Sequence, residues 1–222
     1  MTILLLVAGT NEPSNSALLA DAFADGARGA GVTVEVLRVR DLTLAHFTVE
    51  CYAPGYSNEP DYERLKAAVE RASGLVIATP IWNFGVPAHL KNLIDRMGAF
   101  ALDATHSKGT LGGKPLYTIF TGGAPLPAWT GLMKQTTSFV AESLRYFGAT
   151  PCGTLFEGKC TPGRGVFGLV IDKRPEALAR AKAEGAAFAR IVTAFAQNGS
   201  LPLRQSLFRR LYGIGQRIMK AL

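Results

Sequence analysis

The chain contains few cysteines and no long apolar segment. Its three cysteines, at positions 51, 152 and 160, are too few and too far apart for a disulfide framework, a zinc site or an iron–sulfur cluster. A reducing cytoplasm is therefore expected. No run reaches the roughly 18 apolar residues that a membrane-spanning helix needs. The apolar start, residues 1–12, lacks a basic segment and a cleavage site, so a buried strand is expected there rather than a signal peptide.

Two nucleotide-binding motifs are also missing. Neither GxxxxGK[ST] nor GxGxxG occurs, which disfavours a nucleoside triphosphate or a Rossmann-bound dinucleotide. Acidic residues are absent after Glu184, although the net charge of the whole chain is +7. The basic residues beyond that point are Arg190, Arg204, Arg209, Arg210, Arg217 and Lys220. The main body is nearly neutral as a result, and this argues against a nucleic-acid-binding face.

What is present is a regular alternation of apolar runs and helical patterns. With 48% hydrophobic and 18% charged residues, the composition is typical of a globular protein. Strands are expected at residues 2–9, 32–39, 74–79, 115–123 and 150–158. Helices are expected at residues 17–31, 61–73, 88–97, 129–147 and 174–199. This order predicts an α/β fold with a doubly wound, five-stranded parallel sheet in the order 2-1-3-4-5 and helices on both faces.

Three unusual loops follow strands 1, 3 and 4, so they should meet at one edge of the sheet. The first, "GTNEPSNS", places Thr10, Ser14, Asn15 and Ser16 before a helix, where hydroxyl groups and free N–H groups can bind an anion. A plain helix N-cap explains the same residues equally well. An anion site also requires Glu12 to point away from it.

The second loop, "PIWNFGVP", suits a flat ligand. Trp82 and Phe84 can form apolar walls, Gly85 permits close approach, and the free N–H groups of residues 82–85 can face ring heteroatoms. The alternative is an aromatic plug under a long loop. The third loop begins Thr121-Gly122-Gly123, and its exposed N–H groups can stabilise an anionic ring unless it is a simple glycine turn.

Residues 79–97, "TPIWNFGVPAHLKNLIDRM", resemble the P-x-[YW]-N-x-x-x-P-x-x-L-K-x-x-[IL]-D stretch of flavodoxin-like NAD(P)H-dependent FMN reductases, quinone reductases and azoreductases. The resemblance covers roughly residues 1–195. This sequence differs from the family pattern at three places. These are Glu12, Trp82, where tyrosine is common, and the long tail. The resemblance implies that the FMN phosphate contacts Thr10, Ser14, Asn15 and Ser16, the isoalloxazine contacts Pro80, Ile81, Trp82, Asn83, Phe84 and Gly85, and its pyrimidine edge contacts Thr121, Gly122 and Gly123.

The implied function is hydride transfer from NAD(P)H through flavin N5 to a quinone, an azo compound or free flavin. No catalytic side chain and no metal are then needed, because the flavin carries the chemistry. His106 is a possible pocket residue, while surface positions are expected for His46 and His89. The resemblance also implies a homodimer or tetramer. The alternatives are a flavodoxin-type electron carrier that acts on a protein partner and a flavin-free scaffold.

The tail, residues 200–222, is expected to form a basic amphipathic helix beyond an FMN-binding domain at 1–199. One half of its helical wheel holds Leu203, Leu207, Phe208, Leu211, Ile214, Ile218, Met219 and Leu222. Four basic residues fall on the other half, and only Arg204 breaks the pattern. Such a helix can be an arm packed on its own domain or on a partner subunit, which we prefer, or it can lie on an anionic membrane surface.

Overall fold

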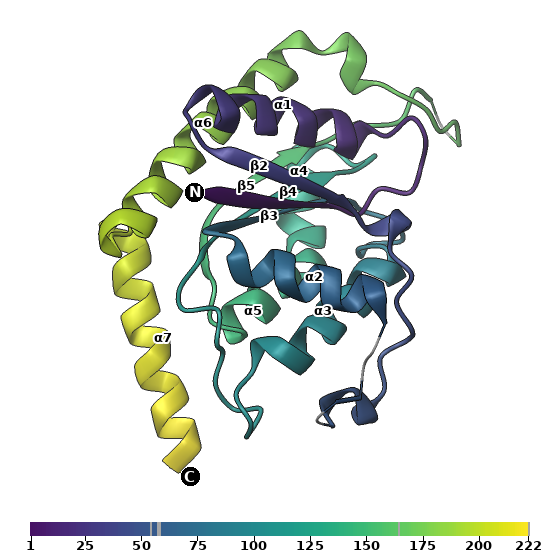
Figure 1. Ribbon diagram of the computed structural model, residues 1–222. Coiled ribbons are helices and arrows are strands. Elements are labelled where there is room, and N and C mark those ends of the chain that lie inside the picture. Colours follow the sequence, from purple (N-terminus) through teal and green to yellow (C-terminus); the bar gives the residue numbers. More distant parts are fainter. Residues whose placement is uncertain (54, 57–58, 164, 222) are drawn as a thin grey trace.

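A five-stranded parallel sheet runs through the computed structural model, which describes residues 1–53, 55–56, 59–163 and 165–221 (Figure 1). The side chains of residues 217–221 lie outside that description. The strands are β1 (Thr2–Val7), β2 (Thr33–Arg38), β3 (Gly74–Pro80), β4 (Pro115–Thr121) and β5 (Thr150–Glu157). Their order is β2-β1-β3-β4-β5, and every pairing is parallel. The predicted sheet and strand order are confirmed.

Helices cover both faces of the sheet (Figure 1). They are α1 (Asn15–Gly29), α2 (Pro60–Arg71), α3 (Ala88–Ala101), α4 (Leu126–Ala128), α5 (Lys134–Tyr146), α6 (Pro175–Asn198) and α7 (Leu203–Ala221). Helices α1 and α6 pack on one face, and α2, α3 and α5 on the other. Alternate residues of β1 enter the two cores, with Leu4 and Leu6 on one side and Ile3, Leu5 and Val7 on the other. This burial on both faces explains why the strand is a continuous apolar run.

The helix that was predicted over residues 129–147 is two elements. A π-helical segment, Trp129–Met133, precedes α5. The indole of Trp129 stacks on the ring of Phe156, with centroids 4.5 Å apart, and its Nε1–H donates to the hydroxyl of Thr137 at 3.3 Å. The π segment therefore places a large aromatic side chain against Phe120 of β4 and Phe156 of β5.

The contact between α1 and α6 is close because two glycines lie in it. A Cβ atom at Gly26 would lie 1.8 Å from the carbonyl oxygen of Lys182, and one at Gly185 would lie 1.9 Å from that of Phe23. Both distances are too short for any side chain. The glycines thus allow the two helices to approach with their backbones nearly in contact.

A buried arginine contacts two residues, Ala45 and Glu59, of the long stretch that lacks periodic cues in the sequence. Arg96 of α3 is fully buried, and its guanidinium pairs with Glu59 at 2.6 Å and donates to the carbonyl oxygen of Ala45 at 3.0 Å. Its Cζ also lies 4.8 Å from the centroid of the Tyr62 ring. Arg96 therefore links Ala45 and Glu59 to α3, and the 3-10 helix Val49–Tyr52 lies between these two residues in the chain.

The tail is helical, as predicted, although its last residue, Leu222, lies outside the described residues. Within the described chain, none of the helices combines the length and the apolar character that crossing a bilayer requires.

Candidate functional site

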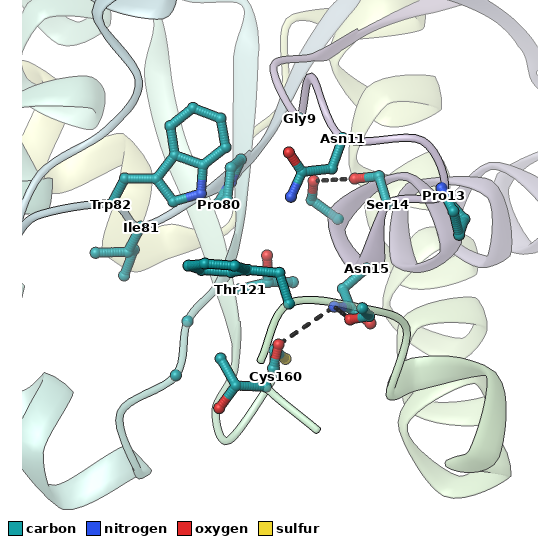
Figure 2. Close-up of a pocket in the computed structure, with 16 residues that line it drawn as sticks. Gly9, Asn11, Pro13, Ser14, Asn15, Pro80, Ile81, Trp82, Thr121 and Cys160 are labelled. Carbon is teal, nitrogen blue, oxygen red and sulfur yellow. Dashed lines mark hydrogen bonds between the residues drawn. The ribbon is translucent and has the colours of Figure 1, made fainter. Parts of the chain in front are cut away.

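A small cleft opens where the carboxyl ends of the parallel strands meet, and Figure 2 shows it between Trp82 on one side and Ser14 and Asn15 on the other. Its volume is about 100 Å³. The lining residues are Gly9, Asn11, Pro13, Ser14, Asn15, Ser16, Pro80, Ile81, Trp82, Thr121, Gly122, Gly123, Cys160, Thr161, Phe167 and Gly168. The three loops predicted to meet at this edge do meet there.

The first loop presents two hydroxyl groups at the N-terminus of α1. Ser14 is the N-cap, and its Oγ accepts from the N–H of Ala17 at 3.3 Å and lies 3.0 Å from Oγ of buried Ser16 (Figure 2). A Cβ atom at Gly9 would lie only 2.5 and 2.4 Å from these two hydroxyl oxygens. The helix cap and the hydroxyl cluster therefore coexist, and Gly9 keeps the space beside the hydroxyls open.

Asn15 has a role that the sequence did not predict. Its Oδ1 accepts from the N–H groups of Val170 and Ile171 at 2.8 and 3.1 Å. Its Nδ2 donates to the carbonyl oxygens of Gly168 at 2.9 Å and Cys160 at 3.3 Å. The side chain thus fixes the loop after β5 against α1, and both of its polar atoms are used in this contact.

Glu12 satisfies the condition set for an anion site. Its side chain is exposed and forms an ion pair with Arg40, which follows β2. The carboxylate is therefore neutralised on the outer side of the loop, away from the Ser14 and Ser16 hydroxyls.

The second loop is a tight hairpin turn. Trp82 and Gly85 exchange two backbone hydrogen bonds at 2.8 and 2.9 Å, while Asn83 and Phe84 take positive φ angles of 49° and 64°. Two non-glycine residues in the left-handed region store strain, which Thr136 offsets by donating to the carbonyl oxygen of Phe84. The expectation of free N–H groups at residues 82–85 is wrong for Trp82 and Gly85, because the turn itself uses them.

The third loop corrects a similar expectation. The N–H of Gly122 donates to the carbonyl oxygen of Glu157 at 3.0 Å, which extends the pairing of β4 with β5. The carbonyl oxygen of Gly122 accepts from the N–H of Cys160 at 2.9 Å. Gly122 therefore offers no exposed donor, whereas Gly123 is exposed at the cleft and Thr121 is buried beside it.

A fourth loop, residues 158–170, completes the cleft, and the sequence reasoning missed it. It contributes Cys160, Thr161, Phe167 and Gly168. The sequence could have predicted this loop, because the glycine-rich stretch follows the carboxyl end of β5, at the same edge of the sheet as the other three loops. Burial raises the pKa of the Cys160 thiol to about 11, so this side chain is a neutral wall rather than a nucleophile.

Four predicted contact residues, Thr10, Asn83, Phe84 and Gly85, do not line this cleft. Asn83 and Phe84 lie at the tip of the hairpin turn, where 66% of Phe84 is exposed.

The histidines lie outside the cleft lining. His106 packs its ring on that of Tyr52, with centroids 4.3 Å apart, and its carbonyl oxygen accepts from the Tyr146 hydroxyl at 2.7 Å. His46 is exposed, as expected. His89 is instead half-buried, because its Nε2–H donates to the carbonyl oxygen of Ala8 at 2.7 Å.

The site carries no metal-binding arrangement in the part of the chain that the structure describes. Among these residues, no three His, Cys, Asp or Glu side chains gather closely enough to hold a metal ion. The cleft chemistry therefore consists of hydroxyls, backbone amides, a helix N-terminus and apolar walls.

Known proteins share this fold and part of this sequence. The solved NAD(P)H:quinone oxidoreductase from Methanothermobacter marburgensis superposes with a TM-score of 0.68 over 85% of this chain and 96% of that one, at 21% identity. An azoreductase from Bacillus anthracis gives 0.62 over 85% and 98%, at 20% identity. At these identities the likeness demonstrates the fold.

Sequence relatives are closer. The FMN-dependent NADH:quinone oxidoreductase of Cereibacter sphaeroides is 33% identical over 136 residues, which cover 57% of this chain and 61% of that protein. The enzyme of the same name from Nitratidesulfovibrio vulgaris is 32% identical over 149 residues, covering 58% and 71%. The chain thus spans less than two thirds of the first of these relatives. A family model described as NADPH-dependent FMN reductase matches residues 1–140, and the chain belongs to that family.

Proposed function

We propose that this protein is an FMN-dependent oxidoreductase that uses NAD(P)H to reduce a small electron acceptor, such as a quinone, an azo compound or free flavin. The observation that carries the proposal is the convergence of four loops at the carboxyl edge of the sheet, with two hydroxyls at a helix N-terminus on one side and an indole on the other. That pairing suits a ligand with an anionic end and a flat end.

The chemistry of the cleft fits FMN at its phosphate end. The hydroxyls of Ser14 and Ser16, together with the first N–H groups of α1, are suited to a phosphate, and the helix dipole favours its charge. Gly9 leaves room beside these hydroxyls that a side chain would fill. Glu12, the acidic residue of this loop, is paired with Arg40 on the outside and does not oppose the ligand.

The flat end of the ligand would meet apolar side chains. Ile81 is buried in the floor, and Trp82, which is 36% exposed, presents its indole to the cleft (Figure 2). Strain in the turn that carries Trp82 is consistent with a binding role, because the anchor from Thr136 holds a single conformation in advance.

Bound FMN would supply the redox chemistry, accepting a hydride from NAD(P)H and delivering reducing equivalents to the acceptor. The chain's own contribution is binding and orientation. Its hydroxyls fix the phosphate, its indole and the Ile81 side chain hold one face of the ring, and the exposed backbone of Gly123 leaves space at the edge of the cleft. No side chain of the cleft is needed as a nucleophile, which agrees with the protonated thiol of Cys160.

A second copy of the chain is part of this proposal. The cleft, at about 100 Å³, is smaller than the roughly 300–1,000 Å³ that ligand pockets usually enclose. Its surroundings carry strongly exposed apolar side chains, namely Phe84 at 66%, Phe167 at 81% and Leu132 at 76%. A homodimer that covers this rim would enclose the rest of the ligand. Light scattering is expected to give a dimer, and a lone monomer at micromolar concentration contradicts this part.

The test of the cofactor assignment is a fluorescence titration with FMN. The double variant Ser14→Ala/Ser16→Ala should bind FMN about 1–3 kcal/mol more weakly, the scale for lost hydrogen bonds to a charged group. Ser138→Ala is the matched control, because that hydroxyl bonds to its own helix in α5, at the carbonyl oxygen of Gln135. Equal affinity in the double variant and the wild type would remove the phosphate assignment.

Turnover tests the reaction. NADH and NADPH oxidation should accelerate when a quinone, an azo dye or free FMN is added to the FMN-loaded protein. A yellow protein that oxidises neither nicotinamide with any of these acceptors would instead act as an electron carrier for a protein partner.

A further inference from the structure

Helix α7 lies along the molecule with its polar side toward the body. Arg209 donates to the carbonyl oxygen of Gly112 at 3.0 Å, and the guanidinium of Arg145 lies 5.8 Å from the centroid of the Tyr212 ring. Gln205 and Ser206 are half-buried on the same side of the helix. Polar and cationic groups therefore make the attachment. Figure 1 shows α7 running along the edge of the molecule to the C-terminus.

The apolar side of α7 is largely exposed, and of its described members only Phe208 and Ile214 also line the groove between α7 and the body. Leu203 is 91% exposed, Leu207 59%, Leu211 55% and Ile214 53%. Their spacing of four, four and three residues places them in one row along the helix, which we call the α7 stripe. Phe208, 58% exposed, lies beside this row. A row of large apolar side chains in water is unfavourable, and such a surface marks a binding face.

The charged residues beside the α7 stripe indicate which kind of surface can cover it. Arg204 and Arg210 are both exposed and lie at its two margins, by the angles of the helical wheel. The α7 sequence, Leu203–Ala221, contains five basic residues and no acidic residue. Two copies of α7 packed stripe to stripe would bring these cations together without compensating carboxylates. An anionic surface matches both features, since it accepts the apolar row and neutralises the cationic margins.

The sequence alone favoured a packed arm, but the α7 stripe is exposed. We therefore propose that α7 binds the surface of a membrane that carries anionic lipids, with the α7 stripe in the boundary between headgroups and acyl chains. Amphipathic helices with cationic margins and apolar rows of this length bind lipid in this way. The inference concerns α7 alone and is independent of the proposed redox function. Its consequence is a protein that is held at a membrane surface while the cleft stays at the far end of the strands.

The test is flotation of the full-length protein with lipid vesicles. Vesicles of equal parts phosphatidylcholine and phosphatidylglycerol should recruit the protein at low ionic strength, and vesicles of phosphatidylcholine alone should recruit much less. Added salt should release it, because exposed charges are screened. Failure to float with the anionic vesicles, or equal recruitment by both kinds, overturns the proposal.

Variants on α7 separate the two parts of the surface. Leu207→Ser/Leu211→Ser should weaken binding by about tenfold or more through lost apolar burial. The matched control is Val49→Ser/Leu126→Ser, a pair that is also exposed, at 76% and 55%, but lies outside α7 and outside the proposed dimer rim, and should bind as the wild type does. Unchanged flotation of the α7 pair overturns the proposal. If that pair instead dissociates an oligomer of a protein that never floats, a second copy covers the stripe.

The charge variant Arg204→Gln/Arg210→Gln should weaken binding to the anionic vesicles by about fivefold for each arginine, the equivalent of about 1 kcal/mol per basic residue near such a surface. Binding to phosphatidylcholine alone should not change. Far-ultraviolet circular dichroism checks that each variant keeps its helix content.

Discussion

Helices α6 and α7 follow each other in the chain, and each has a row of residues with the same spacing. The row is buried in α6 and exposed in α7. In α6 the row is Ala177, Ala181, Gly185 and Phe188, and all four are buried against α1 and the sheet. In α7 the row is Leu203, Leu207, Leu211 and Ile214, and all four are more than half exposed. The helix with the larger apolar side chains is the one that leaves them uncovered.

The difference lies in what each row can meet. The α6 row is made of small residues around one phenylalanine, so the backbone of α1 can approach to contact at Gly26 and Gly185. Bulky leucines would prevent that approach. The α7 row consists of large side chains and includes no glycine that would let another backbone approach. The body contacts the polar side of α7, so the row stays more than half exposed within the described part of the chain. An amphipathic pattern in the sequence therefore predicts that a helix has an apolar face, but it does not predict which surface will cover that face.

The largest expected effect compares two phenylalanines. Phe188→Ala in α6 removes a ring that is 1% exposed, and it should lower the free energy of unfolding by about 4 kcal/mol. Phe208→Ala in α7 removes a ring that is 58% exposed, and the change should stay within about 0.5 kcal/mol. Urea denaturation measures both. Similar losses for the two variants would show that α7 is packed as tightly as α6.

Two glycines give the next comparison. A Cβ atom at Gly185 would meet the Phe23 carbonyl oxygen at 1.9 Å, so Gly185→Ala should force the helices apart and cost about 3 kcal/mol. A Cβ atom at Gly213 would meet nothing within 4 Å, so Gly213→Ala should instead stabilise α7 by about 0.5–1 kcal/mol through helix propensity. Thermal unfolding should therefore shift in opposite directions. A stabilising Gly185→Ala would refute the close contact.

Two thiols of the body, buried Cys160 and half-buried Cys152, should make its stability sensitive to alkaline pH. Burial raises the pKa of Cys152 and of Cys160 from 9.0 to about 11. The unfolded thiols lose their protons first as the pH rises, so this stability is complete below pH 9 and declines between pH 9 and about 11. The expected slope is about 1.4 kcal/mol per pH unit for each thiol. Denaturation of Cys152→Ala/Cys160→Ala over that range should give a shallower slope, and an unchanged slope contradicts the assignment.

The smallest effect concerns the attachment of α7. Arg209→Ala removes the hydrogen bond to the carbonyl oxygen of Gly112 and should lower global stability by less than about 1 kcal/mol. Hydrogen exchange should nevertheless rise in α7 more than in α6, because the polar contact holds only that helix. Equal exchange in both helices would indicate a further anchor.

The position of the cleft could be predicted from the sequence because parallel strands align their carboxyl ends. Once five strands alternate with helices, the loops after β1, β3 and β4 must share an edge. Residues 79–97 additionally resembled a known family, and that family assignment is confirmed by the match over residues 1–140. The same rule places the loop after β5 at this edge, although no residue of that loop was predicted to line the cleft.

The sequence by itself determined the strands, the helices and the edge where the cleft lies, because apolar periodicity and turn residues act over a few neighbouring positions. Only the tertiary structure decided which polar groups remain available there. It used the N–H groups of Trp82 and Gly122 internally and turned Asn15 into the clamp of a loop some 150 residues away. It also decided that α7 presents its polar side to the body. Hydrogen-bond partners and covered faces depend on which distant segments meet, and no local pattern in the chain encodes that.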